Sequence, residues 1–415
     1  MNFATVDPLF SNGAQVSLAI LIIVLVKVVV GFAVIMGAVT LMIWFERKAI
    51  SDMQSRIGPQ RWGPFGLLQT LADGIKLFAK EDLIPAEADR VVFKLAPYLV
   101  LVPALITFSV IPLGGTVTVA GHVIELQIAN PPMGILVMLA MSGISVYGVM
   151  LAGWSSGSKY PLLSSVRASA QMISYEAALG MTIVTVALIT GSLSTHDIVT
   201  SQAGGIWHWN LIRLGFVPFV LFVIAITAEL NRPPFDVVEA ESELVGGFHT
   251  EYSSVRFALF FMAEFMNTLT MSALIVTLFL GGPAGWVPNI AHVRWVFPIL
   301  WFLAKTTGFA FSYIWFRAAL PRFRYDQVME LGWKRLIPLS LGWMLIIAGF
   351  LIKPADGFAM AALVIIAWTL LSRAFELGAD RVSGPGALMP IVGERPLPGE
   401  VIRAASDAMD EDEGE

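Results

Sequence analysis

The sequence predicts an all-α protein that crosses a membrane many times. Only 14% of its 415 residues are charged and 56% are hydrophobic, whereas soluble globular domains carry roughly 25% charged residues. Apolar runs of about 20 residues, the length that a helix needs to cross the hydrocarbon core, recur along most of the chain. Lipid is therefore the expected solvent for most of the protein surface.

These apolar runs predict nine membrane-spanning helices. Their ranges are 16–45, 97–114, 133–153, 170–190, 213–230, 256–280, 295–317, 336–352 and 357–373. The last run follows a short connection, so we expect an extra transmembrane helix within 353–373. We expect the acidic residues of 374–415 to form a solvated, flexible tail.

The basic residues between the spans predict the orientation, because cytoplasmic connections carry an excess of Lys and Arg. Three segments that precede or separate the spans hold no Lys or Arg: 1–15, 115–132 and 191–212. Four connections carry the excess: 46–96, 154–169, 231–256 and 317–335. We therefore expect the N-terminus outside and these four connections and the tail in the cytoplasm. The protein is expected in a cell membrane, the plasma or inner membrane.

The composition limits the chemistry that the chain can perform alone. It has no cysteine, and its five histidines show no paired metal-ligand spacing. We therefore expect neither a disulfide nor a thiolate-ligated iron–sulfur cluster, and no metal site. Any redox cofactor would belong to a partner, which argues against a stand-alone redox enzyme. A secondary transporter would show two halves related by a repeat, and the sequence shows none.

The first basic connection predicts an amphipathic helix between Gly66 and Lys80. Apolar and polar residues lie on opposite helical faces: Leu67, Leu71, Ile75 and Phe78 against Gln69, Asp73, Lys76 and Lys80. Such a helix either lies on the membrane surface or docks a soluble partner with its polar face.

The connection between the fifth and sixth spans concentrates carboxylates. Two arginines, Arg232 and Arg256, accompany six acidic residues: Glu229, Asp236, Glu239, Glu241, Glu243 and Glu251. Pro233 and Pro234 predict the end of the fifth span near Arg232, and Asp236 with Glu239 predicts a capping box for a short new helix. Glu239 and Glu243 share a helical face, so their repulsion favours proton uptake. A solvated acidic loop is equally compatible with this spacing.

Three ionisable residues lie inside predicted spans: Glu176, Glu264 and Lys305. A charge in the hydrocarbon core is costly, so such a residue marks a functional site unless a buried partner neutralises it. The sequence leaves both alternatives open. Glu46 and Arg47 close the first span at the membrane boundary, where charges cost little.

Several longer segments carry a family signature. They read ERKAISDMQSRIGPQRWGPFGLLQTLADGIKLFAKE (46–81), GWSSGSKYPLLSSVRASAQMISYE (153–176), AELNRPPFDVVEAESELVGGFHTEY (228–252), FALFFMAEFMN (257–267) and RAALPRFRYDQVMELGWKRLIP (317–338). In this order they resemble the H-subunit family of complex I-type NADH:quinone oxidoreductases, which includes the first mitochondrially encoded complex I subunit. The resemblance covers roughly residues 16–352, so nothing is carried over to the residues beyond.

The resemblance implies a membrane domain over residues 1–352 with eight helices, the first one tilted. It implies a subunit of an H+-translocating NADH:quinone oxidoreductase that has quinone as its substrate and binds no cofactor itself. Two soluble subunits would complete the quinone chamber, further membrane subunits would adjoin the chain, and FMN and iron–sulfur clusters would belong to partners. No nucleic-acid partner is expected.

The resemblance also implies roles for individual residues. The implied quinone passage includes Glu46, Arg47, Arg56, Asp73, Lys76 and Arg232. The implied proton path includes Glu176, Glu229, Asp236, Glu239, Glu241, Glu243, Glu251 and Glu264. Arg167 and Arg317 are implied as basic partners of these acids. One alternative stays open: the homologous foot subunit of a related complex, either a deazaflavin-dependent dehydrogenase or a membrane-bound hydrogenase.

Overall fold

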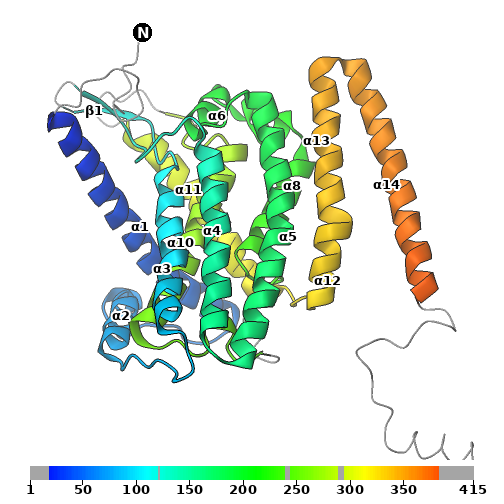
Figure 1. Cartoon of the computed structure of the whole chain (residues 1–415). Coiled ribbons are helices and arrows are strands. Elements are labelled where there is room, and N and C mark those ends of the chain that lie inside the picture. Colours follow the sequence, from blue (N-terminus) through cyan, green and yellow to red (C-terminus); the bar gives the residue numbers. More distant parts are fainter. Residues whose placement is uncertain (1–17, 120–121, 239–243, 288–293, 383–415) are drawn as a thin grey trace, which may run out of the picture. The chain divides into compact units, whose positions relative to one another are not determined.

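The computed structural model of the chain describes residues 18–119, 122–238, 244–287 and 294–382. The chain divides into two units, Met1–Met360 and Ala361–Glu415. Helices dominate the described residues, and one small β-hairpin accompanies them (Figure 1). The predicted fold class, an all-α polytopic membrane protein, is confirmed.

A helix lies at each of the nine predicted spans. These helices are α1 (Leu18–Met53), α3 (Arg90–Ser109), α4 (Gly134–Ser155), α5 (Lys159–Thr190), α8 (Phe216–Glu229), α10 (Ser254–Phe279), α11 (Val296–Ala319), α13 (Ile337–Ile352) and α14 (Pro354–Val382). Shorter helical elements connect them: η1 (Pro64–Gly66), α2 (Gln69–Ala79), α6 (Thr195–Ser201), η2 (Ile206–His208), α7 (Asn210–Arg213), η3 (Gly247–His249), α12 (Tyr325–Glu330) and η4 (Leu331–Leu336). Within the described residues, eight helices are long and apolar enough to cross a membrane, the one ending at Ile352 being α12, η4 and α13 in continuous sequence.

The fifth predicted span is shorter than a membrane is thick. Helix α8 has 14 residues, about 21 Å at the usual helical rise, whereas the hydrocarbon core is about 30 Å thick. It packs against α5, α10 and α13, so protein surrounds it on several sides. A helix shorter than the hydrocarbon core is tolerated where protein satisfies its terminal backbone groups, as the Gln171 amide does for the Ala228 carbonyl near the end of α8.

Helix α1 crosses the bundle at a slant, as the resemblance implies, and α2 lies near the same end of the bundle as the end of α1 (Figure 1). Helix α2 contains the polar and apolar faces predicted for residues 66–80. Its apolar residues Leu71, Ile75 and Phe78 are exposed in the chain. The two predicted uses of this helix, lying on the membrane or docking a partner, therefore remain open.

The predicted connection 154–169 is largely helical. Helix α5 begins at Lys159, so only residues 156–158 separate it from α4. Gly157 allows this tight reversal, because its φ of 66° lies in the left-handed region and a Cβ there would lie 2.9 Å from the carbonyl oxygen of Glu87. The apolar-run analysis missed the first turns of α5 because serines and lysine interrupt hydrophobicity without interrupting the helix.

The opposite end of the bundle contains the hairpin and the partner of Lys305. Strands β1 (Thr116–Val119) and β2 (His122–Glu125) pair in antiparallel register, with Thr116 opposite Glu125. The Lys305 ammonium donates to the carbonyl oxygens of Leu280, Gly282 and Ala284 at 2.8, 3.1 and 2.7 Å. These groups follow the end of α10, so Lys305 stabilises the exposed carbonyls of a helix C-terminus.

The second unit is described only up to residue 382. Its described part is the continuation of α14, which meets the length and apolarity needed for a membrane span over Pro354–Phe375. The apolar side chains of Leu363, Ile366 and Leu370 are exposed. An apolar helix at the predicted extra span is therefore present, and the predicted acidic tail lies mostly outside the described residues.

Candidate functional site

Among the described residues, four charged side chains form an ionic cluster that joins α1, α10, α11 and the turn after α8, with Glu46 and Arg232 buried, Glu264 partly buried and Arg317 at its exposed edge. The Arg232 guanidinium lies 2.8 Å from the Glu46 carboxylate through Nη1 and 3.3 Å from the Glu264 carboxylate through Nη2. Arg317 pairs with the other oxygen of Glu46. Two carboxylates and two guanidiniums give the cluster no net charge when all four are ionised. Glu46 and Arg232 are only 4% and 2% exposed, so their charges need partners inside the protein.

The turn after α8 places Arg232 in the interior. Asn231 has a φ of 51°, a left-handed conformation that Asn tolerates better than most residues and that commonly ends a helix. On α5, the Gln171 amide donates to the carbonyl oxygens of Ala228 and Phe235 at 2.8 and 2.9 Å. It also donates to the Asn231 side chain at 3.1 Å. The buried Gln171 amide therefore fixes the turn from both sides.

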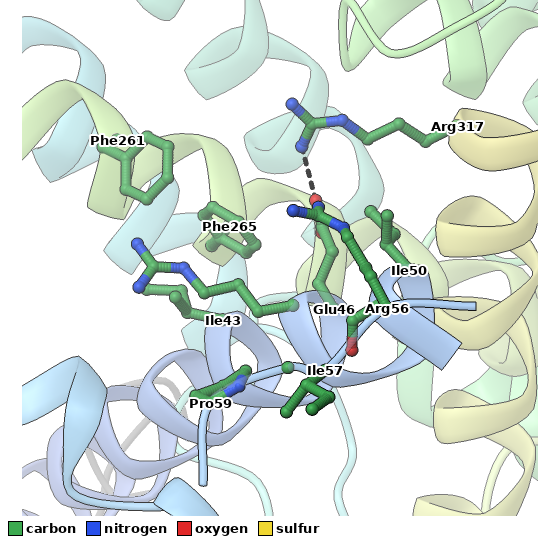
Figure 2. Close-up of a pocket in the computed structure, with 12 residues that line it drawn as sticks. Ile43, Glu46, Ile50, Arg56, Ile57, Pro59, Phe261, Phe265 and Arg317 are labelled. Carbon is green, nitrogen blue, oxygen red and sulfur yellow. Dashed lines mark hydrogen bonds and ion pairs between the residues drawn. The ribbon is translucent and has the colours of Figure 1, made fainter. Parts of the chain in front are cut away.

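A cavity of about 570 Å³, the Arg56 cavity, opens beside the ionic cluster. Its lining residues come from α1, the segment after it, α10 and α11: Ile43, Glu46, Arg47, Ile50, Ser51, Arg56, Ile57, Gly58, Pro59, Phe261, Phe265 and Arg317. Figure 2 shows Arg317 directed at Glu46, with Phe261 and Phe265 on the α10 side of the cavity. The cavity thus combines isoleucine and phenylalanine surfaces with three arginines and one carboxylate.

Helix α2 is held close to this cavity by polar contacts with α1. Arg47 pairs with Asp73 of α2 and also lines the Arg56 cavity. Lys76 lies 3.8 Å from the same carboxylate, and the Trp44 indole donates to the carbonyl oxygen of Phe65 at 3.0 Å. The structure therefore brings Glu46, Arg47 and Arg56 to one cavity and places Asp73 and Lys76 beside it.

A second group of polar side chains lies deeper in the helix bundle. Glu229, which is 6% exposed, accepts a hydrogen bond from Ser142 of α4. Gly143 follows Ser142 on α4, and the Glu176 carboxylate of α5 lies against it. A Cβ on Gly143 would be 3.4 Å from the Oε1 atom of Glu176. The two carboxylates therefore meet α4 at consecutive positions.

Two small cavities link this polar group to the ionic cluster. The His249 cavity, about 70 Å³, is lined by Glu264 and Glu229 together with His249, Asn267 and Ser145, among largely apolar residues. The Ser142 cavity, about 20 Å³, shares Glu229, Asn267 and Ser145 with it. These volumes have room for about two water molecules and one water molecule respectively. Glu264 belongs both to the ionic cluster and to the His249 cavity, so polar groups continue from one to the other.

His249 belongs to the connection between α8 and α10. Its ring stacks on Phe257 at 5.3 Å between centroids and contacts Phe248 at 5.2 Å. Burial lowers the pKa of His249 from its ordinary value to about 4, because the interior disfavours the charged imidazolium. The ring is therefore neutral at physiological pH, with one nitrogen as a donor and the other as an acceptor.

The remaining predicted residues are not part of the ionic cluster. Asp236 lies 3.9 Å from Arg322, and the Arg167 guanidinium lies over the Tyr325 ring at 5.5 Å. Glu251 follows η3 and is partly buried. Three further predicted acids and the predicted new helix lie at positions outside the described residues: Glu239, Glu241 and Glu243.

Sequence reasoning missed several polar residues that shape the site. Gln171, Ser142 and Asn267 lie inside apolar spans and His249 lies in the acidic connection. A polar side chain in a span is a weak signal alone, because Ser and Asn also occur where helices pack closely. Among the described residues, no group of three or more His, Cys, Asp or Glu side chains is arranged to hold a metal ion.

Comparison with known proteins identifies the family. Residues 26–348 match the family described as NADH dehydrogenase. The H subunit of the NADH-quinone oxidoreductase of Frankia alni is 51% identical over 338 residues, which cover 80% of this chain and 74% of that protein. An H subunit of the Koribacter versatilis NADH-quinone oxidoreductase, the one numbered 2, is 47% identical over 343 residues, covering 80% of this chain and 97% of that protein. The chain belongs to the NADH dehydrogenase family.

Membership of this family confirms the resemblance seen in the sequence. The matched range includes all four residues of the ionic cluster and every lining residue of the Arg56, His249 and Ser142 cavities. It ends at residue 348, so α14 lies outside the part of the chain that defines the family.

The ionic cluster gives the first prediction. Arg232→Gln leaves the Glu46 and Glu264 carboxylates in the interior without their shared cation, which we expect to cost about 3–5 kcal/mol. Less assembled complex should be recovered from membranes, and it should lose activity at a lower temperature. The control is Arg213→Gln, because this exposed residue lies outside the basic connections and an exposed charge contributes about 0–1 kcal/mol. Adding Glu264→Gln to Arg232→Gln should restore part of the loss. Recovery and heat stability equal to the control would contradict the structural role of the cluster.

Proposed function

We propose that the chain is the membrane subunit that forms the quinone passage of an H+-translocating NADH:quinone oxidoreductase. The observation that carries the proposal is the Arg56 cavity, in which an apolar wall and a group of charged side chains face the same space. Its volume of about 570 Å³ is in the range of small-molecule sites. Family membership supports the same reaction, because the related proteins from Frankia alni and Koribacter versatilis are named subunits of this oxidoreductase.

The two kinds of lining residue suit the two parts of a membrane quinone. Ile43, Ile50 and Ile57 with the two phenylalanines offer an apolar surface to an isoprenoid tail. Arg56 and Arg317 can donate hydrogen bonds to quinone oxygens, and this donation would strengthen as negative charge develops on reduction. Because the cavity lies where α1 ends and the polar connection begins, a quinone could enter from lipid and move towards a soluble electron donor.

The electron donor would lie in partner subunits. The full sequence has no cysteine to hold an iron–sulfur cluster, so FMN and the clusters would be bound by other chains. Soluble subunits would cover the basic connections at the end of the bundle where α2 lies, and further membrane subunits would contact the exposed apolar helices. The orientation follows from the positive charge of these connections, which favours the cytoplasmic side.

The acidic residues provide a route for protons away from the quinone passage. The ionic cluster contains Glu264, the His249 cavity reaches from Glu264 to Glu229, and both Glu229 and Glu176 meet α4. We propose that protonation in the quinone passage changes the pairing of Glu264 and passes protons along this line. The acids at 239, 241 and 243 remain candidates for the start of the route, together with Asp236 and Glu251.

The alternative, a foot subunit of a deazaflavin-dependent dehydrogenase or a membrane-bound hydrogenase, would share much of this architecture. The relatives found are named for NADH and quinone, which favours the first proposal. Oxidation of NADH or of reduced deazaflavin by the purified complex distinguishes the donors directly.

The Arg56 cavity gives the second prediction. Arg56→Ala removes a guanidinium from the cavity, so we expect kcat/KM for quinone to fall about tenfold, corresponding to about 1.4 kcal/mol. Reduction of a hydrophilic artificial acceptor by NADH should change little, because that acceptor takes electrons before the quinone passage. Arg61→Ala is the matched control, since Arg61 is an exposed arginine in the same segment but does not line the cavity. An equal loss of both activities, or a loss in the control alone, would count against the quinone passage.

The proton route gives the third prediction. Glu229→Gln keeps the shape of the side chain and an oxygen that can accept from Ser142, but it cannot release a proton. We expect NADH:quinone turnover and proton uptake into liposomes to fall together by roughly tenfold or more. Glu87→Gln, a change at an exposed acid on the first basic connection, should leave both unchanged. Normal turnover with normal proton uptake in Glu229→Gln would remove this residue from the route.

A further inference from the structure

His249 is a partly buried titratable residue to which the proposed function gives no role. It lines the same cavity of about 70 Å³ as Glu264 and Glu229, the two acids between which the proposed proton route has to cross. Among the described lining residues of this cavity, these three are the titratable ones. The remaining polar lining comes from Ser145, Asn231 and Asn267, and most of the other residues are apolar.

Packing of the connection between α8 and α10 fixes the position of the His249 ring. Gly247 begins the short helix η3 with a φ of 71°, and a Cβ there would overlap the carbonyl oxygen of Val238. The same carbonyl oxygen accepts a hydrogen bond from Ser164 of α5 at 2.7 Å. The connection is thus packed tightly onto α5, and the imidazole contacts the rings of Phe248 and Phe257.

The chemistry of a neutral imidazole decides what this residue can do. Because the surroundings of the His249 ring disfavour its protonation, His249 is poorly suited to carry a proton itself. It can donate one hydrogen bond and accept another, which is what one or two confined water molecules need to be oriented between two carboxyl groups. Apolar walls alone would leave such water without fixed partners.

We infer that His249 is a positioning residue that orients water in the His249 cavity, so that protons cross between Glu264 and Glu229. This inference rests on the proposed function, because it assigns the crossing point of the proposed proton route. The proton moves from one carboxyl group through water to the other carboxylate, and the imidazole has the same protonation state before and after. The role requires hydrogen-bonding atoms at the ring position and does not require a group that titrates.

Three substitutions distinguish this role from the alternatives. His249→Phe keeps an aromatic ring against Phe248 and Phe257 but removes both hydrogen-bonding atoms. His249→Asn and His249→Gln remove the ring and its titration but supply an amide that donates and accepts near the Nδ1 or Nε2 position. His208→Phe, at an exposed histidine on η2, is the matched control.

The experiment uses the intact complex in liposomes and measures quinone turnover, proton uptake and the ratio of rates in H2O and D2O. We expect His249→Phe to slow turnover and uptake roughly tenfold and to raise the solvent isotope effect, because proton transfer becomes rate-limiting. At least one amide variant should recover most of the rate and the parent isotope effect. The His208→Phe control should match the parent.

Two outcomes would overturn the inference. Parent-like behaviour of His249→Phe would mean that only packing matters, and equal loss in all three variants would mean that titration of the ring is required. Glu229→Gln and Glu264→Gln are measured in the same series. If both acid variants behave like the parent, the proton route of the proposed function fails and the inference fails with it. If both are slow while His249→Phe is normal, the inference alone fails.

Discussion

The need to pair charges away from water governs the architecture around Arg232. This guanidinium is buried between the carboxylates of Glu46 and Glu264, and Arg317 completes the group on α11. A charge left alone where Glu46 and Arg232 are buried would cost several kcal/mol, so these groups have to stay paired. The requirement fixes the end of α1, the turn after α8 and the facing sides of α10 and α11. The left-handed conformation of Asn231 and the three hydrogen bonds from Gln171 lie in the turn beside Arg232. Together they fix the position of Arg232.

The cluster also lies between two spaces of different character. On one side is the Arg56 cavity, whose isoleucines, phenylalanines and arginines suit an amphipathic quinone. On the other side are the His249 and Ser142 cavities, which have room for only a few water molecules and are lined by a few carboxyl, amide, hydroxyl and imidazole groups among apolar residues. In the proposed function, a change of charge on the quinone side would alter the balance among Glu46, Arg232 and Glu264. The electrostatic cost of an unpaired Glu264 would then favour proton uptake towards Glu229.

Much of the fold could be predicted from the sequence because lipid imposes a simple rule on composition. Runs of apolar residues located a helix at all nine predicted spans, and the amphipathic period located α2. The rule failed where polar residues continue a helix, as in the first turns of α5 from Lys159. It also could not reveal that α8 is short, because an apolar run does not distinguish lipid neighbours from protein neighbours. The hairpin of β1 and β2 was missed because so short a pair of strands has little hydrophobic pattern.

The sequence predicted many residues of the site but few of the contacts between them. The family signature pointed to Glu46, Arg56 and Glu264. The cost of a charge inside a span predicted that Glu264 and Lys305 have either a functional role or a neutralising partner. Their explanations differ: Glu264 pairs with an arginine 32 positions away in sequence (264 − 232), whereas Lys305 binds backbone carbonyls at the end of α10. No one-dimensional pattern specifies such partners. Gln171 was missed for the same reason, since its three acceptors become neighbours only after α5 and α8 pack.

The central claim is that quinone occupies the Arg56 cavity, and photolabelling of the intact complex tests it most directly. The protein has a second large cavity, about 670 Å³, which is lined by Trp209, Trp286 and other side chains that do not ionise, at the end where Lys305 binds its carbonyl oxygens. A photoreactive quinone, added with and without excess unlabelled quinone, would be followed by peptide mapping of this chain. We predict competed adducts within 43–59 or 261–265. Competed adducts confined to 199–209 and 283–287, with none around Arg56, would contradict the account.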